Sequence, residues 1–142
     1  MISINSVEKS DCLKLIEIEK NLFNDPTSIV ELENYLNEDS IKIWKLQTTK
    51  IIGFVCFYHL KEEVEILKIG ILKSYQRKKY GSLIINEMKK LKIKKIFLEV
   101  SVENLQAIKF YLKNGFEKIG IRKAYYKGNN QRVDALRLLF EF

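Results

Sequence analysis

The stretch "IGILKSYQRKKYGSLIINEMKKL", from Ile69 to Leu91, decides the fold. Residues typical of a strand end at Ile71 or Leu72, the basic turn "QRKKYGS" follows, and an amphipathic helical pattern begins at once. A strand, an amide-rich loop and a helix N-terminus form an anion site, because free N–H groups and the helix dipole point at the loop. The pattern therefore predicts a phosphate cradle, with Gly81 present and Lys79 where a second glycine is expected.

The composition is that of a soluble globular protein. The chain has 142 residues, of which 46% are hydrophobic and 30% charged, enough to bury one core. A single proline and the lack of a linker-like run predict one domain over residues 1–142. No apolar run approaches the roughly 20 residues of a membrane span, and no signal-peptide pattern is present. Cys12 and Cys56 lack metal-like or redox-like spacing, so we expect reduced thiols, no metal and a cytoplasmic location.

The net charge of +7 and the run "KKLKIKK" (89–95) raise the possibility of a nucleic-acid partner. The cations are 21 lysines and only 4 arginines, whereas base and phosphate recognition relies on the planar guanidinium group. Aromatic residues are not interleaved with the lysine run, as a stacking surface requires. We therefore interpret the run as a solvated helix end and turn, and expect no direct nucleic-acid binding.

Hydrophobic periodicity predicts two helices, three strands, then helix, strand, helix and two final strands, which is an α/β fold with a sheet of mixed direction. The helices are predicted at residues 11–23, from Ser28, at 81–91 and at 104–114, and the strands at 41–48, 51–60, 64–71, 95–102, 116–123 and 134–142. Ser28 and Glu31 form a capping-box pattern, and Gly115 is a typical C-terminal cap. The first helix is expected to bury Cys12, Leu15, Ile16 and Leu22.

Two segments resemble the GNAT N-acetyltransferase family. The turn at residues 76–81 matches the signature Q/R-x-x-G-x-G/A at Gln76 and Gly81 and departs from it at Lys79. The second segment, "LEVSVENLQAIKFYLKNGF" (98–116), has every named letter of a strand ending in L-E-V followed by N-x-x-A-I-x-x-Y-x-x-x-G-F. The resemblance covers essentially the whole chain. It implies the GNAT fold, with a mixed, mostly antiparallel sheet of about six to seven strands flanked by about four helices.

The resemblance implies acetyl-CoA as co-substrate. In the family, the pantetheine arm bonds the backbone of the third long strand, and the diphosphate lies on the turn before the long helix. The corresponding residues are Ile69, Gly70 and Ile71 for the arm, and Arg77, Lys78, Lys79, Tyr80, Gly81 and Ser82 for the diphosphate. Lys79 fits if its φ is negative, and a positive φ would cost roughly 1 kcal/mol. Asn104 would bond the arm, and it can at the same time be a plain N-cap.

Glu99 and Tyr111 are the catalytic candidates. Strand alternation places Glu99 on one face with Phe97 and Ser101, where partial burial would make it a useful base. Its alternative is an exposed residue or a salt bridge to a lysine. The resemblance implies that Glu99 accepts the amine proton, through water, and that Tyr111 protonates the leaving thiolate. Without the resemblance, Tyr111 would be interpreted as a core aromatic of an amphipathic helix.

The tail "RKAYYKGNNQRVDALRL" (122–138) resembles the RimI-type ribosomal-protein-alanine N-acetyltransferases and related protein N-terminal acetyltransferases. Tyr125, Tyr126, Asp134 and Ala135 match their paired tyrosines and the Asp-Ala of the last strand. The resemblance implies that the tyrosines clamp the backbone of a substrate N-terminus, with Asp134 beside them. Val133 replaces an acidic residue common in that branch, and "NDPTS" (24–28) lacks its tryptophan. An alternative for the tyrosines is a plain aromatic pair at a strand end.

Three functions remain open at this point. The first is acetylation of a protein N-terminus, with the N-terminal alanine of a small-subunit ribosomal protein as the expected acceptor. The second is acetylation of a small amine such as a polyamine, amino sugar or antibiotic. The third is a basic binding module without catalysis. A Ser-His or Cys-His hydrolase is poorly supported, because His59 is the only histidine and has no nucleophile motif near it.

Overall fold

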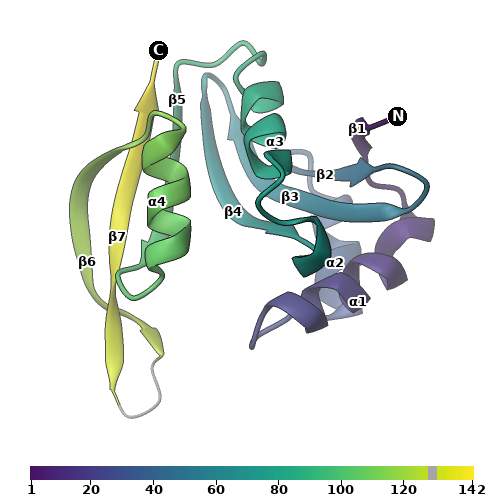
Figure 1. Cartoon of the computed structure of the whole chain (residues 1–142), viewed down its shortest axis with the longest axis horizontal. Helices are drawn as coiled ribbons and strands as arrows, with labels where there is room; N and C mark the ends of the chain where they lie inside the picture. The colour runs from purple at the N-terminus through teal and green to yellow at the C-terminus, as the bar shows by residue number, and fades with distance from the viewer. Residues whose placement is uncertain (128–130) are drawn as a thin grey trace.

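The computed structural model describes residues 1–127 and 131–142, and it contains one seven-stranded sheet in the order β1-β2-β3-β4-β5-β7-β6 (Figure 1). The strands are β1 Ser3–Ser6, β2 Ile41–Gln47, β3 Ile51–Leu60, β4 Glu63–Ile71, β5 Lys95–Ser101, β6 Glu117–Lys127 and β7 Arg132–Glu141. The α-helices are α1 Cys12–Leu22, α2 Ile29–Leu36, α3 Tyr80–Met88 and α4 Leu105–Lys113, with 3-10 turns η1 Lys9–Asp11 and η2 Lys73–Tyr75. All neighbouring strands are antiparallel except β4 and β5, so the predicted fold class is confirmed.

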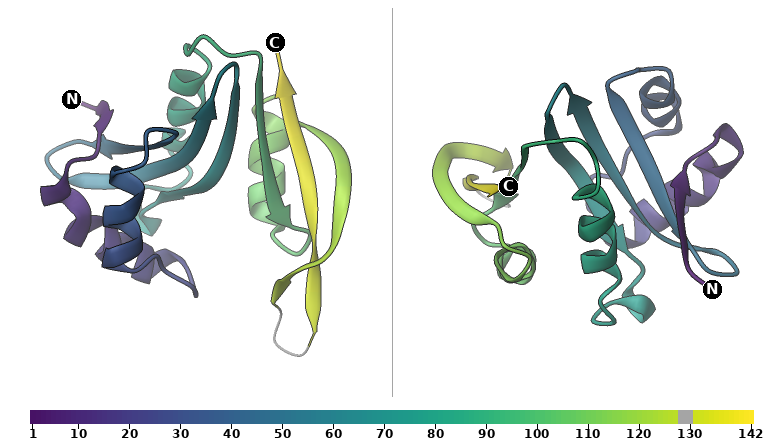
Figure 2. Two further views of the ribbon diagram at one scale, coloured as in Figure 1. Left: turned by 180° about the vertical axis from the view of Figure 1, so that it is seen from behind. Right: turned by 90° about the horizontal axis from the view of Figure 1, so that it is seen from above.

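Helices cover both faces of the sheet, as the view from above shows (Figure 2). Helices α1 and α2 pack on β2 and β3 around a cluster that includes Leu15, Leu32 and Phe54. Helices α3 and α4 pack on the other face around a larger cluster that includes Phe57, Ile85 and Leu138. Strand β3 is buried on both faces, which is why its apolar run shows no alternation.

The predicted caps are present. The Ser28 hydroxyl accepts from the Glu31 N–H at 3.1 Å, and the Glu31 carboxylate accepts from the Ser28 N–H at 3.4 Å. The Asn104 side chain accepts from the Ala107 N–H at the start of α4. Gly115 follows α4 with φ +94°, a left-handed conformation that favours glycine.

Three details differ from the sequence prediction. Strand β1 is not predicted, because its four residues, "SINS", have no apolar pattern and form a strand only by pairing with β2. The last two strands run farther into the predicted loop 124–133, of which 128–130 lie outside the described residues. In α1 the buried set is Cys12, Leu15, Ile18 and Glu19, so the predicted burial of Ile16 and Leu22 is wrong; both are half-buried. Glu19 lies on the same face of the helix as Cys12 and Leu15, so a carboxylate faces the sheet.

Strands β4 and β5 pair over only part of their length. Their parallel register runs from Glu63 opposite Lys95 to Ile66 opposite Leu98, and both strands continue beyond it without pairing to each other. The pairing with β5 ends at a β-bulge in β4. Neighbouring residues Cys56 and Phe57 of β3 lie opposite Lys68 and Ile66 of β4, so Leu67 is an extra residue without a partner on β3. We call residues 67–71 of β4 and 99–101 of β5 the fork. It exposes backbone groups in the middle of the sheet (Figure 1).

Candidate active site

The cradle, residues 77–82, presents a row of free backbone donors beside the fork. Gln76 N–H bonds the Lys73 carbonyl, and the first helical bond of α3 runs from Leu83 N–H to the Lys79 carbonyl. Between these two, none of the N–H groups of residues 77–82 has a hydrogen-bond acceptor within the described part of the chain. Six adjacent donors at a helix N-terminus suit an anion such as a diphosphate.

The backbone of the cradle alternates in sign. Arg77 and Lys79 have φ of +62° and +67°, and Lys78 between them is not in this region. This alternation turns successive N–H groups toward one side and forms a nest. Of the two cases left open for Lys79, a negative or a positive φ, the structure shows the positive one. The nest needs the left-handed conformation here, and a lysine adopts it at roughly 1 kcal/mol.

Gly81 and Gln76, the matching letters of the signature, have structural contacts. A Cβ at Gly81 would lie 2.9 Å from two ring atoms of Phe110 on α4, so this glycine allows α3 and α4 to pack closely. The Gln76 side chain donates to the Ile71 carbonyl at 2.7 Å, which ties the cradle to the end of β4. Both residues set where the cradle lies relative to the fork.

Ile69, Gly70 and Ile71, predicted to bond the pantetheine arm, lie on the β4 side of the fork. They pair with β3 on one edge, and on the other edge the pairing with β5 has already ended. A Cβ at Gly70 would meet Leu22 at 2.9 Å, so α1 sits directly against this segment. The segment offers strand-like backbone groups to an extended ligand.

Glu99 lies on the β5 side of the fork. Its Oε1 accepts from Arg122 Nη1 at 2.9 Å, and its side chain is 22% exposed. Its Oε2 is buried and has no hydrogen-bond partner in the described part of the chain. A cavity of about 260 Å³ lies beside it, lined by Glu99, Ile121, Arg122 and Arg137. A buried acceptor without a partner calls for a functional explanation.

Tyr126 contacts Glu99, and Tyr111 lies buried on α4. The Tyr126 hydroxyl donates to the Glu99 backbone carbonyl at 3.0 Å. Burial, then the neighbouring Tyr125 and Glu99, raise the pKa of Tyr126 to about 12. Tyr111 is 6% exposed between Phe110 and Phe116, and burial, with Tyr126 as a second cause, raises its pKa above the ordinary range. Both hydroxyls therefore stay protonated at neutral pH and can act as donors.

The hairpin of β6 and β7 carries the remaining predicted residues. Tyr125 packs edge-on against Tyr126, with ring centroids 4.9 Å apart, and the Arg122 guanidinium lies 4.6 Å from the Tyr125 ring centroid. We call Glu99, Arg122, Tyr125 and Tyr126 the Glu99 cluster. Asp134 has a different set of contacts: its Oδ1 accepts from the Ala124 N–H at 2.8 Å. It supports the bulge in β6, where Ala124 has φ +51°.

The structure thus forms two groups of predicted residues. Arg77–Ser82 lie at the N-terminus of α3, and Glu99, Tyr125 and Tyr126 gather at β5 and the hairpin. Tyr111 lies on α4. Asn104 and Asp134 bond backbone N–H groups. Asn104 keeps its amide NH₂ group available, because the cap uses only the oxygen.

Sequence reasoning missed the charged partners on the face of Glu99. Arg122 pairs with it directly, and Arg137 is its cross-strand neighbour on β7. Burial, and secondly the charge of Glu99, raise the pKa of Glu65 on β4. Only the strand register brings these residues together, and no sequence spacing indicates it.

Most lysines of the run contact other residues of the protein. Lys89 donates to the Asn114 carbonyl and lies over the Phe140 ring, and burial lowers its pKa. Lys90, Lys94 and Lys95 pair with Glu87, Glu62 and Glu141, respectively. These contacts agree with the interpretation of a helix end and turn.

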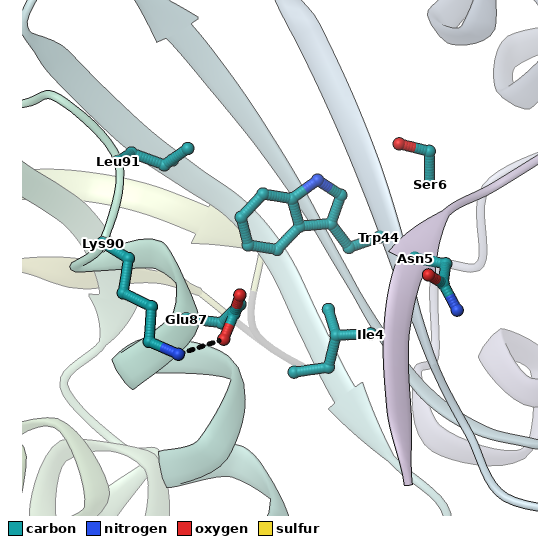
Figure 3. A pocket seen from close by; sticks show the side chains of 7 residues that line it. All are labelled: Ile4, Asn5, Ser6, Trp44, Glu87, Lys90 and Leu91. Carbon is teal, nitrogen blue, oxygen red and sulfur yellow. Dashed lines mark hydrogen bonds and ion pairs between the residues drawn. The ribbon is translucent and has the colours of Figure 1, made fainter.

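A second cavity, of about 440 Å³, lies between β1, β2 and the end of α3, with the Trp44 ring pointing into it (Figure 3). It is lined by Ile4, Asn5, Ser6, Trp44, Glu87, Lys90 and Leu91. None of the predicted site residues lines it.

No group of three or more His, Cys, Asp or Glu side chains within residues 1–127 and 131–142 is arranged to hold a metal ion. Of the helices described, none is long and apolar enough to cross a membrane. Cys12 and Cys56 are buried and free, and burial raises the pKa of the Cys56 thiol to about 12.

The fold agrees with the comparisons to known proteins. The acetyltransferase (GNAT) family model matches residues 11–116, and this chain belongs to that family. A [ribosomal protein bS18]-alanine N-acetyltransferase of Haemophilus influenzae is 31% identical over 130 residues, covering 89% of this chain and 88% of that protein. The Escherichia coli protein of the same name is 27% identical, covering 96% of this chain and 95% of that protein.

Solved structures give the same result. The crystal structure of the ribosomal-protein-S18-alanine N-acetyltransferase from Escherichia coli superimposes with a TM-score of 0.88 at 26% identity, covering 99% of this chain and 94% of that chain. Arabidopsis thaliana NAA60, in complex with a bisubstrate analogue, has a TM-score of 0.85 at 20% identity over 99% of this chain and 98% of that chain, and shows the shared fold alone. The chain is an N-acetyltransferase, so a non-catalytic binding module is excluded.

Proposed function

We propose that this enzyme transfers the acetyl group of acetyl-CoA to the N-terminal α-amine of a protein, with a small-subunit ribosomal protein that begins with alanine as its acceptor. The observation that carries the proposal is the similarity, over nine-tenths of the chain, to an enzyme named for alanine acetylation of ribosomal protein bS18. The hairpin tyrosines beside Glu99 support it. We place the enzyme in the cytoplasm, with residues 1–142 acting as one domain.

Acetyl-CoA fits the β4 side of the fork. Its diphosphate would accept from the free N–H groups of the cradle, with Arg77 and Lys78 adding positive charge. Its pantetheine amides would bond the strand-like backbone at residues 69–71, and the Asn104 amide at the start of α4. Neither contact depends on a glycine at position 79.

Glu99 is the base in this proposal. Arg122 holds Oε1 in one orientation and leaves Oε2 without a partner, so the carboxylate would accept the proton of the amine through a water molecule. The amine nitrogen then attacks the thioester carbonyl, and the thiolate of CoA leaves. Tyr111 is the acid, because its buried hydroxyl is protonated at neutral pH and can give a proton to the thiolate sulfur.

The acceptor side favours an α-amine. At pH 7.5 an α-amino group with a pKa of about 7.8 is roughly one-third neutral, whereas a lysine with a pKa of about 10.4 is about 0.1% neutral. A single carboxylate therefore has the easier task with an N-terminus. Tyr125 and Tyr126 at the hairpin would hold the first peptide groups of the acceptor, each bond contributing roughly 1 kcal/mol.

The test is a panel of acceptors at equal concentration. A peptide with the N-terminal sequence of the ribosomal protein, starting at alanine, is compared with the same peptide blocked at its N-terminus and carrying an internal lysine, and with spermidine. We expect kcat/KM for the free peptide to exceed the others by about 100-fold or more, which corresponds to about 2.7 kcal/mol. Equal turnover of spermidine, or acetylation of the blocked peptide on lysine, would overturn the proposed acceptor.

A further inference from the structure

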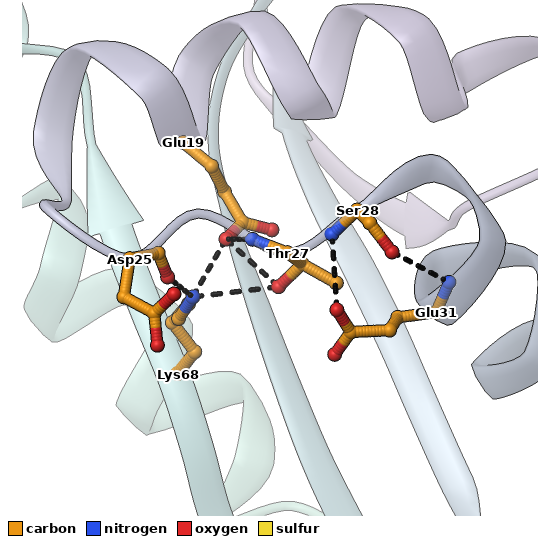
Figure 4. Close-up of polar contacts among 6 residues, drawn as sticks. All are labelled: Glu19, Asp25, Thr27, Ser28, Glu31 and Lys68. Atoms are coloured by element: carbon orange, nitrogen blue, oxygen red, sulfur yellow. Dashed lines mark hydrogen bonds and ion pairs between the residues drawn. The ribbon is translucent and has the colours of Figure 1, made fainter.

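A buried carboxylate anchors the loop between α1 and α2 (Figure 4). Glu19 on α1 is only 2% exposed, and its Oε1 accepts three hydrogen bonds. Two come from Thr27, from the backbone N–H and the hydroxyl, both at 2.9 Å. The third comes from Lys68 Nζ at 2.7 Å. We call Glu19, Thr27 and Lys68 the loop anchor.

Lys68 adds further contacts to the same loop. Its Nζ donates to the Asp25 carbonyl at 3.3 Å and lies 4.8 Å from the Phe23 ring centroid. One ammonium group thus contacts the loop at its start, its middle and its end. The other polar contacts of the loop in the described part of the chain are at its ends, where Phe23 N–H bonds the Glu19 carbonyl and Ser28 caps α2. Residues 24–27 are held in place chiefly by Lys68 and Glu19.

Lys68 connects this loop to the fork. It is the first residue of β4 after the bulge at Leu67, on the stretch that has parted from β5. It lies opposite Cys56 and on the α1 side of the sheet. Tyr58 is two residues after Cys56 on β3 and therefore shares the α1 side. Glu65 lies opposite both Tyr58 and Phe97, and Glu99 is two residues after Phe97, so Glu99 is on the α1 side too. The loop and the β6–β7 hairpin lie at the same end of the molecule, with the fork between them (Figure 1, Figure 2).

From this placement we infer that Glu19 and Lys68 are positioning residues for the acceptor. They fix the α1–α2 loop as the wall of the acceptor site opposite the Tyr125–Tyr126 hairpin. The inference rests on the proposed function only in assigning the α1 face of the sheet, beside the fork, to the acceptor. Acetyl-CoA would use the N–H groups of the cradle and the backbone of residues 69–71, and none of the side-chain contacts of the anchor involves these groups, so its binding should not depend on the Glu19 and Lys68 side chains.

The test removes both charges together. Lys68→Met alone leaves a buried, unpaired carboxylate and endangers folding, so the variant is the double change Glu19→Gln with Lys68→Met. The matched control is Asp11→Asn with Lys45→Met. That pair has the same kind of contact, 2.8 Å between Nζ and Oδ2 with side chains 16% and 15% exposed, but it joins η1 to β2 and contacts neither the loop nor the hairpin.

We expect Glu19→Gln/Lys68→Met to raise KM for the acceptor about tenfold, with KM for acetyl-CoA unchanged within about twofold and kcat reduced much less than acceptor KM rises. The control pair leaves both KM values unchanged. The Thr27 amide, which donates to Glu19, should exchange hydrogen faster in the double variant only. Thr27→Val, which keeps the ion pair, gives a milder rise in acceptor KM and serves if the double variant is poorly folded.

Two outcomes overturn the inference. One is an unchanged acceptor KM in a folded Glu19→Gln/Lys68→Met variant. The other is a parallel rise in both KM values. The measurement uses whichever amine the wild-type enzyme acetylates best, peptide or polyamine, and is expressed as variant over wild type. A negative result in the peptide panel would therefore reject the proposed acceptor, and the role of Glu19 and Lys68 would still be tested by the KM ratios.

Discussion

The two sides of the fork present their functional groups by different means. On the β4 side, the cradle offers six backbone N–H groups whose direction is set by φ angles at Arg77 and Lys79. On the β5 side, the Glu99 cluster is made of side chains from β5 and β6 that meet only because the strands pair through β7. A site of backbone groups tolerates changes of side chain. A site of side chains does not.

The first and largest expected effect concerns the β5 side. Glu99→Gln should lower kcat by about 100-fold or more near neutral pH, the size of a general-base contribution. The deficit should shrink as pH rises through the amine's pKa of about 7.8, because the amine then loses its proton unaided. Steady-state rates between about pH 6 and 9 measure this.

The matched control for Glu99 is Glu65→Gln. It removes a carboxylate from the same face of the sheet, and we expect kcat to stay within about threefold of wild type. A Glu99→Gln enzyme within about threefold of wild type at every pH would falsify the assignment of the base.

The second prediction concerns Tyr111, which lies on α4 between the two sides. Tyr111→Phe should lower kcat about tenfold and leave the affinity for acetyl-CoA unchanged, because only proton donation to the thiolate is lost. Rapid-mixing rates and calorimetric titration with acetyl-CoA separate the two quantities. Tyr35→Phe on α2, a tyrosine whose pKa burial also raises, is the control and should be silent. A parallel fall in affinity would indicate that Tyr111 acts by packing.

The third prediction concerns Tyr126 in the hairpin. Tyr126→Ala should raise acceptor KM about fivefold, the equivalent of about one hydrogen bond, and spare acetyl-CoA binding. Tyr126→Phe keeps the ring and removes the bond to the Glu99 carbonyl, so it apportions the effect between packing and hydrogen bonding. Initial rates at varied peptide and fixed acetyl-CoA give the result. An increase in KM for acetyl-CoA instead would mean that the two sides of the fork are not independent.

The smallest expected effect is on the β4 side. Lys79→Gly removes the strain of φ +67° but adds freedom to the unfolded chain, so we expect a gain of up to about 1 kcal/mol and a melting temperature higher by about 2–4 °C. Acetyl-CoA should bind within about twofold of wild type. Lys78→Gly, at a position outside the left-handed region, should lower stability instead. A Lys79→Gly protein that no longer binds acetyl-CoA would show that the lysine side chain, not the backbone, holds the ligand.

The sequence was sufficient for the features that depend on local pattern. The limits of β3, the capping box at Ser28 and the cap at Gly115 all follow from apolar runs and cap residues within a few positions of one another. The cradle was predictable for the same reason, since a strand, turn and helix N-terminus are contiguous. Its φ angles were not, because the strain at Lys79 is imposed by the packing around it.

Features that depend on distant pairing were not predictable. Glu19 and Lys68 are 49 residues apart, and Glu99 and Arg122 are 23 apart. Each could have paired with several other charges in a chain with 25 basic residues. Glu19 lies on the same face of α1 as Cys12 and Leu15, but a buried carboxylate is not expected without a partner, and its partner Lys68 is on distant β4.

The close approach of Gly81 to Phe110 also bears on how relatives of this enzyme can diverge. The two glycine positions of the signature are under different constraints. At position 79 the constraint is conformational strain of roughly 1 kcal/mol, which a stable chain can absorb, as this one does with lysine. At position 81 the constraint is steric, because a Cβ would lie 2.9 Å from the Phe110 ring, so a side chain there would require the ring or α4 to move. A search pattern that insists on glycine at the first position would therefore miss this chain, whereas one that insists on a small residue at the last position would keep it.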